Sequence, residues 1–209
     1  MVLQVNQLKA KGMRQAVSFS VPAEQLVLLY GVSGTGKSVL MRALADLIVH
    51  EGEVLLDGVE QRGLCPENWR RQVMYFSAET AWWRETVEEH FETLPSAETL
   101  HKLGLDNDYL KRSVNSLSSG EKQRLALLRG LLYEPRVLLL DEITANLDFD
   151  SALDVEKMVL DYSRQHQAGV LWVSHDQAQQ KRLADSEWLW DIEDLYAGRP
   201  AENSGGVAE

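Results

Sequence analysis

One glycine-rich segment has the residue types and spacing that bind a chain of phosphates. It consists of Gly31, Val32, Ser33, Gly34, Thr35, Gly36, Lys37 and Ser38, which match G-x-x-x-x-G-K-[ST]. Glycines let successive backbone N–H groups approach a phosphate, and a helix that begins after the loop adds partial positive charge. We predict that this loop binds a nucleoside triphosphate, with Lys37 on the β- and γ-phosphates and Ser38 on Mg²⁺. A plain glycine-rich turn is the alternative, and the strand-like run before the loop disfavours it.

Two adjacent carboxylates, Asp141 and Glu142, follow the apolar run Val137 to Leu140. Such a run is typical of a buried parallel strand, so the two acids are expected at the sheet edge where α/β folds bind ligands. We predict that Asp141 holds Mg²⁺ through its water shell and that Glu142 is the general base for an attacking water. An isolated Asp-Glu pair is more often a solvated strand end, but the phosphate loop favours the catalytic interpretation.

The segment Leu117 to Arg124 reads LSSGEKQR and closely resembles the L-S-G-G-E/Q signature of ATP-binding cassette (ABC) ATPases. The resemblance implies that Ser118, Ser119 and Gly120 contact the γ-phosphate of an ATP bound by a second subunit. Physically, the segment opens a helix whose amides can donate to a phosphate. Taken alone, Ser-Ser-Gly-Glu is more often a simple helix cap.

Further landmarks resembling those of the ABC family follow in the family's order. Asn146 to Asp148 resembles the D-loop, which implies that Asp148 contacts the second subunit. His175 follows the apolar run Val170 to Val173 and matches the switch histidine, which implies contact with the γ-phosphate. The remaining histidines lack such a context, and we expect ordinary surface residues at His50, His90, His101 and His166.

The resemblance extends from about Val2 to Asp191 and implies an ATP-hydrolysing, nucleotide-binding subunit of an ABC transporter. It implies ATP and Mg²⁺ as cofactors, and Lys37, Glu142 and His175 as catalytic residues. It also implies a homodimer with ATP at the interface and a separate transmembrane permease subunit, which would hold the chain at the inner face of the membrane. The small size and the run Val137 to Leu147 followed by Val170 to Asp176 are similar to those of Fet-type iron-export ATPases.

Two other functions are compatible with these motifs. A soluble ABC ATPase of DNA repair or translation generally carries a long coiled-coil insertion or two cassettes, and this sequence has neither. A nucleotide-gated assembly module with weak hydrolysis is suggested by the unusual Glu79, whereas Glu142 and His175 argue against it. A transporter ATPase is therefore the leading hypothesis.

Two positions depart from the family pattern. Glu79 follows the run Val73 to Ala78, where the family has a glutamine that touches Mg²⁺ and couples to the membrane partner. Its carboxylate can offer oxygen to Mg²⁺ but adds negative charge, so we group Glu79 with Ser38 and Asp141 as metal ligands and expect stronger Mg²⁺ dependence. Gln7 to Gly12 contains no aromatic residue to stack on adenine, so we expect weak discrimination between ATP and GTP.

Short apolar runs that alternate with helical spacing predict an α/β fold, namely a P-loop NTPase of the ABC type with a mainly parallel core sheet. The expected core strands are Leu26 to Tyr30, Val73 to Phe76, Val137 to Leu140 and Val170 to Val173. Turn signals predict a small antiparallel sheet that includes Val17 to Val21 and Glu53 to Leu56. The helix after the phosphate loop is expected to reach about Val49.

A chain of 209 residues, 44% of them apolar, suits one domain. We expect an ABC ATPase domain over residues 1–196, with a helical lobe inserted at about 80–116, and a flexible tail at 197–209. Trp82 and Trp83 lie near the start of this lobe, and they are placed either at an interface with a membrane subunit or in the core of the lobe.

Composition excludes several classes of protein. No apolar run reaches the roughly 18 residues of a membrane-spanning helix, and the N-terminus lacks the pattern of a secretory signal, so we expect a cytoplasmic location. A net charge of −11 disfavours binding to nucleic acid. The single cysteine, Cys65, is expected to be an unreactive thiol.

Overall fold

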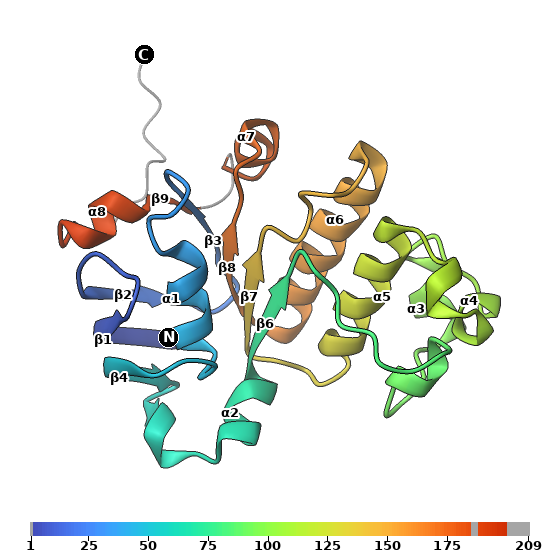
Figure 1. The fold of residues 1–209 in the computed structure, drawn as a ribbon, viewed down its shortest axis with the longest axis horizontal. Coiled ribbons are helices and arrows are strands. Elements are labelled where there is room, and N and C mark those ends of the chain that lie inside the picture. The colour runs from blue at the N-terminus through green and yellow to red at the C-terminus, as the bar shows by residue number, and fades with distance from the viewer. Residues whose placement is uncertain (1, 185–187, 200–209) are drawn as a thin grey trace.

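The computed structural model describes residues 2–184 and 188–199, and a five-stranded parallel sheet runs through its centre (Figure 1). The strand order is β6-β7-β8-β3-β9. The strands are β3 (Leu26–Tyr30), β6 (Val73–Ser77), β7 (Val137–Asp141), β8 (Gly169–Val173) and β9 (Trp188–Asp191). Every residue of β7 and β8 is buried, as expected for parallel strands covered on both faces. The four predicted core strands are confirmed, whereas β9 was not predicted.

A smaller antiparallel sheet packs beside the first half of the chain, as predicted. Its order is β2-β1-β4-β5. The strands are β1 (Leu3–Ala10), β2 (Val17–Val21), β4 (His50–Leu56) and β5 (Val59–Glu60). Asp57 and Gly58 join β4 to β5 with positive φ angles of 48° and 82°, the backbone of a tight hairpin turn.

Helices cover both faces of the parallel sheet (Figure 1). They are α1 (Lys37–Leu44), α2 (Pro66–Gln72), α5 (Ser119–Leu131), α6 (Phe149–His166), α7 (Gln177–Ala184) and α8 (Ile192–Tyr196). Side chains alternate along each strand, so Val27 and Leu29 pack with α1 and the antiparallel sheet, while Leu26 and Leu28 pack with α5 and α6. The expected extension of α1 to Val49 was wrong, because Asp46 takes a left-handed φ of 57° just past the helix.

Short helices form a lobe beyond α5, at the far right of Figure 1. They are α3 (Ala97–His101), α4 (Asp108–Lys111) and the 3₁₀ turns Glu88–His90 and Val114–Ser116, with a third 3₁₀ turn, Gln61–Gly63, elsewhere in the chain. A bridge between Thr86 and Ser113 ties the two ends of the lobe together. Its apolar core includes Leu125 and Leu128 of α5, so the lobe is anchored on that helix.

No helix in residues 2–184 or 188–199 combines the length and apolar character needed to cross a membrane. Most of the expected flexible tail, residues 200–209, lies outside the part of the chain that the structure describes.

Candidate functional site

The phosphate loop joins β3 to α1 in a shape that requires glycine. Gly31 has a φ of 138°, and a β-carbon there would lie 2.5 Å from the Ile192 Cγ2 atom of α8. The Thr35 hydroxyl donates to the Val32 carbonyl at 2.7 Å, and the buried Tyr196 hydroxyl donates to the Thr35 carbonyl at 2.6 Å. The loop is therefore braced from within and by α8.

Lys37 directs its ammonium into the phosphate loop. Its Nζ donates to the carbonyls of Gly31 and Val32 at 2.8 and 3.0 Å, and only 5% of the residue is exposed. Burial lowers the pKa of Lys37, while the charges of Glu142 and Asp141 act in the opposite direction. A buried ammonium held by neutral carbonyls would gain electrostatic stabilisation from phosphate oxygens.

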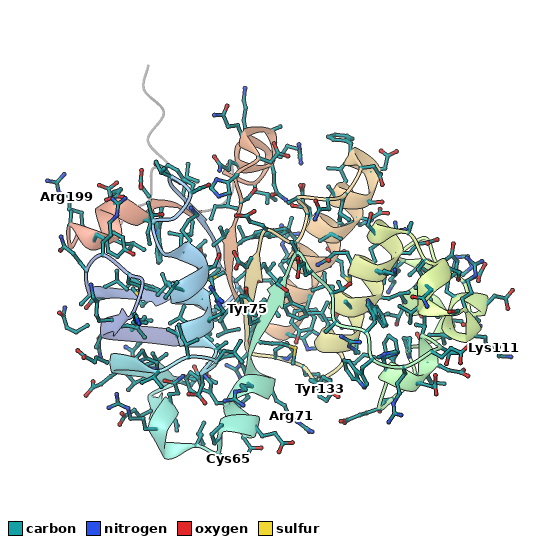
Figure 2. The ribbon with its side chains drawn as sticks, viewed as in Figure 1. Cys65, Arg71, Tyr75, Lys111, Tyr133 and Arg199 are labelled. Carbon is teal, nitrogen blue, oxygen red and sulfur yellow. The ribbon has the colours of Figure 1, made fainter. Side chains whose placement is uncertain are left out.

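Asp141 connects the end of β7 to the phosphate loop. Its Oδ1 accepts from the Ser38 hydroxyl at 3.1 Å, and its Oδ2 accepts from the Tyr75 hydroxyl at 2.8 Å. Burial, followed by the bond to Asp141, raises the pKa of Tyr75, so the phenol remains a donor at neutral pH. Tyr75 lies near the centre of the view in Figure 2, whereas Lys111 marks the tip of the lobe.

Sequence reasoning did not single out Tyr75. The available signal was its place in β6, two residues before Ser77, which pairs with Asp141. The structure brings together the oxygens of Ser38 and Asp141, which are ligands of the kind that Mg²⁺ prefers. These two residues therefore fit the predicted magnesium site.

Glu142 and His175 meet at the same sheet edge. The His175 Nε2 lies 3.1 Å from the Glu142 Oε1, and both side chains are partly exposed. Glu142 has a left-handed φ of 54°, which is uncommon for a residue with a side chain and is typical of functional sites. Its N–H donates to the Val173 carbonyl at 3.0 Å, so this backbone is fixed to the end of β8. The pair opens into a pocket of about 390 Å³ that Leu147, Phe149 and Arg182 also line.

The signature segment forms the start of α5. Ser118 is the N-cap, since its hydroxyl accepts from the Glu121 N–H at 3.3 Å and its N–H donates to the Glu121 carboxylate at 2.7 Å. Ser119 donates to the Asn146 carbonyl at 3.4 Å. A β-carbon at Gly120 would lie 3.1 Å from the Ser151 Oγ, so glycine lets α5 approach α6 closely. The cap interpretation is therefore correct for Ser118, and the predicted contact of this segment with a phosphate of a second subunit stays a prediction.

The phosphate loop and the start of α5 lie far apart in one chain. In Figure 1 they are on opposite sides of β6, β7 and β8. Asp148, the predicted D-loop residue, is the exposed N-cap of α6, and its carboxylate accepts from the N–H and hydroxyl of Ser151 at 2.9 and 2.8 Å. These hydrogen bonds lower the pKa of Asp148. Its predicted contact with a second subunit stays a prediction.

Glu79 lies in a groove next to the other predicted magnesium ligands, and its part in binding the ion stays a prediction. It is exposed and lines a separate groove of about 240 Å³ with Gln123, Arg129 and Tyr133, between β6 and α5. Within the described residues, no hydrogen bond or ion pair connects its carboxylate to Ser38 or Asp141.

The two tryptophans at the start of the lobe have different environments. Trp82 packs against the lobe core, while Trp83 is 64% exposed. The Arg129 guanidinium lies 4.8 Å from the Trp82 ring and 4.9 Å from the Trp83 ring. Of the two environments expected for the tryptophans, Trp82 therefore has the one in the lobe core, and Trp83 lies at the surface.

His90 is 5% exposed, so the expectation of a surface residue was wrong. Its Nε2 accepts from the N–H groups of Trp83 and Arg84, both at 2.9 Å, and its Nδ1 lies 2.9 Å from the Thr86 carbonyl. A neutral ring with its proton on Nδ1 satisfies all three bonds. His90 thus fixes the loop that carries the tryptophans, a role that depends on backbone groups and leaves no pattern in the sequence.

Comparison with known proteins agrees with this geometry. Residues 14–145 match the family described as ABC transporter. The chain is 35% identical over 172 residues to the probable iron export ATP-binding protein FetA of Escherichia coli (strain K12), covering 77% of this chain and 76% of that protein. It is 33% identical over 217 residues to the phosphate import ATP-binding protein PstB of Aeropyrum pernix, covering 92% and 84%.

A solved structure described as the ATP binding subunit of an ABC transporter has the same fold. It superimposes with a TM-score of 0.77 at 25% identity, covering 97% of this chain and 89% of that one. The predicted family and fold are thereby confirmed. The chain belongs to the ABC transporter family, of which it is an ATP-binding subunit with ATPase activity.

Proposed function

We propose that two copies of this chain bind two MgATP molecules head to tail and that closure of this dimer drives a separate transmembrane subunit. The observation that carries the proposal is the separation, in one chain, of the phosphate loop from the start of α5 (Figure 1). Ser118 is the N-cap of that helix. One chain offers each ATP a cradle on one side only. Two copies related by a twofold axis would provide the start of α5 from the partner at each site.

The catalytic roles follow from the residues at the sheet edge. Lys37 binds the transferred phosphate, Glu142 accepts a proton from the attacking water, and His175 contacts the γ-phosphate while holding Glu142 in place. The 3.1 Å contact between Glu142 and His175 and the unusual backbone of Glu142 support this assignment. The strand ends supply these groups on rigid elements, as catalysis requires.

Ser38 and Asp141 are proposed to hold Mg²⁺. When bound, the ion would supply positive charge that offsets the negative charge developing during phosphoryl transfer. Tyr75 orients Asp141 by donating to the oxygen that Ser38 leaves free. Glu79 is proposed to influence the ion through its charge, because its carboxylate lies in the neighbouring groove.

A membrane subunit is proposed to dock at the groove lined by Glu79, Gln123 and Arg129. Trp83 supports this placement, since it exposes a large apolar ring beside that groove. Such docking would place the chain at the cytoplasmic face of the membrane. The named relatives are an iron export and a phosphate import ATP-binding protein at similar identity, which supports the proposal that the membrane subunit recognises the cargo.

The dimer is tested by sedimentation of the full chain with a Glu142→Gln substitution, which should slow hydrolysis and preserve ATP binding. We expect a monomer without nucleotide and a dimer with ATP. Adding Ser118→Arg should abolish the dimer while binding of a fluorescent ATP analogue is retained. A Glu142→Gln chain that remains monomeric at saturating ATP would contradict the head-to-tail arrangement.

The membrane partner is tested by purifying the tagged chain from its native cells in mild detergent and identifying the bound proteins by mass spectrometry. A stoichiometric polytopic membrane protein is expected, and Trp83→Ala should reduce its recovery. Recovery of soluble partners alone would contradict the transporter role.

A further inference from the structure

A buried amide lies directly behind the Glu142–His175 pair. Gln179, in α7, is only 1% exposed. Its Oε1 accepts from the Ser174 hydroxyl at 2.5 Å and from the Thr144 hydroxyl at 3.1 Å, and its Nε2 donates to the Glu156 carboxylate at 3.0 Å. The amide therefore bonds at both ends, to α6 on one side and to the two catalytic segments on the other.

The two hydroxyls belong to the segments that carry the catalytic pair. Ser174 immediately precedes His175, and Thr144 comes two residues after Glu142. A single amide oxygen therefore fixes the segment after β7 relative to the segment after β8. These are the segments whose side chains meet at 3.1 Å.

Glu156 determines which way the amide points. This carboxylate, in α6, is 5% exposed and accepts from the Arg182 guanidinium at 2.7 and 3.3 Å. Because a carboxylate only accepts, Gln179 must present its N–H₂ to Glu156 and its oxygen to the hydroxyls. A carboxylate at position 179 would lose that donor and oppose Glu156, so the arrangement requires an amide.

We propose that Gln179 is a positioning residue for hydrolysis, setting the separation and orientation of Glu142 and His175 from behind. The proposal rests on the catalytic roles assigned to that pair. Gln179 makes no contact with nucleotide in this role. Its partners are the hydroxyls of Ser174 and Thr144 and the carboxylate of Glu156, which is paired with Arg182. Its effect is therefore confined to the chemical step.

The test compares steady-state ATP hydrolysis, equilibrium binding of a fluorescent ATP analogue and thermal unfolding for variants of the full chain. Gln179→Leu should lower kcat by about tenfold or more, because small misplacement of catalytic groups is costly. The nucleotide Kd should stay within about twofold, since the phosphate loop takes no part in the cluster. Gln165→Leu, an exposed glutamine of α6, is the matched control and should leave all three measurements unchanged.

A swapped pair gives the sharper test. Gln179→Glu alone should lower kcat as strongly as Gln179→Leu, because two carboxylates then face each other. Combining it with Glu156→Gln removes the facing charges and lets the amide at position 156 donate to the new carboxylate at position 179, so kcat should rise above that of Gln179→Glu alone. The rise should be partial, because the Arg182 guanidinium donates to the same atom of residue 156 in the natural chain and would then face a donor. If Gln179 served stability alone, the thermal unfolding temperature would change in these variants while kcat stayed at its natural value.

Several results would overturn the positioning role. These are a Gln179→Leu chain with kcat within twofold of the natural chain, or a nucleotide Kd that rises as much as kcat falls. If Gln179→Leu fails to fold, Thr144→Val with Ser174→Ala removes the same two bonds and must show the same loss of kcat. A natural kcat in the Glu142→Gln chain would overturn both the catalytic role of Glu142 and the positioning role of Gln179. A reduced kcat in Glu142→Gln together with a natural kcat in Gln179→Leu would overturn the positioning role alone.

Discussion

The phosphate-loop edge and the start of α5, the two regions that we propose to bind nucleotide phosphate, are built differently. The first gathers Lys37, Asp141 and His175, which lie at or after the ends of three strands that are distant in sequence. The second is a local capping box between Ser118 and Glu121, closed within four residues. One region depends on the whole sheet, whereas the other depends on a single helix end.

This difference explains how the two regions can serve one reaction. Charged groups that bind metal and activate water need fixed mutual distances, which a parallel sheet provides. A helix end needs only its own amides to donate to a phosphate, so it can act on a nucleotide held by another chain. The contrast predicts a severe loss at the chain's own ATP site from damage at the sheet edge, and a loss at the partner's ATP site from damage at α5.

The largest expected effect is that of Lys37→Ala. Removing the buried ammonium should lower ATP turnover by about 100-fold or more, because it stabilises charge in the transition state. Phosphate release measured on the purified chain checks this, with Lys111→Ala in the exposed lobe as the control. Retention of more than a tenth of the turnover would contradict the role of Lys37.

Ser118→Asp tests the other region. Aspartate remains a good N-cap, so the thermal unfolding temperature should be preserved, while its charge should repel the γ-phosphate and lower turnover by about tenfold. Ser118→Ala should instead lower stability by about 1 kcal/mol.

Mixing the two damaged chains sharpens the comparison. Each mixed dimer of Lys37→Ala and Ser118→Asp chains has one intact site, so an equimolar mixture should recover about a quarter of natural turnover. If each chain used its own α5, mixing would restore nothing.

The sequence predicted the elements whose signals are local. The phosphate loop, the strands that end at Asp141 and near His175, and the cap at Ser118 all have their determinants within about a dozen residues. For this reason four of the five strands of the core sheet, and the polar residues that follow them, could be predicted from the sequence alone, whereas β9 was not.

The features that escaped prediction depend on pairings across the chain. Tyr75 reaches Asp141 across 66 residues, and Gln179 joins segments from α6, β7 and β8. Neither a lone tyrosine in a strand nor a glutamine in a polar helix has a pattern that reveals such a partner. Glu79 was grouped with the magnesium ligands by its place in the sequence, and that grouping stays a prediction, since Glu79 lines the neighbouring groove together with Tyr75 and Ser77.

Tyr75→Phe should have a smaller effect. Loss of the bond to Asp141 should raise the Mg²⁺ concentration for half-maximal turnover by about fivefold, because one hydrogen bond contributes roughly 1 kcal/mol. A magnesium titration of turnover checks this. Tyr162→Phe is the matched control, since that hydroxyl donates to the Pro135 carbonyl, away from the site, and should change stability alone.

The smallest expected effect is that of Glu79→Gln. It should reduce the dependence of turnover on Mg²⁺ by about twofold or less, since an exposed charge outside the site is screened by solvent. The same titration in low and high salt checks it, and the difference should shrink as salt rises. Unchanged magnesium dependence at low salt would show that Glu79 has no influence on the ion.

The position of β3 has a consequence for the order in which the ATP site can form during synthesis. The phosphate loop is made early, but β3 pairs with β8 and β9, and Ile192 and Tyr196 of α8 brace the loop. These partners are translated more than 130 residues after the loop. A nascent chain that has emerged only as far as β7 therefore carries the motif without its support, and ATP binding should begin only when the last strand and α8 have left the ribosome.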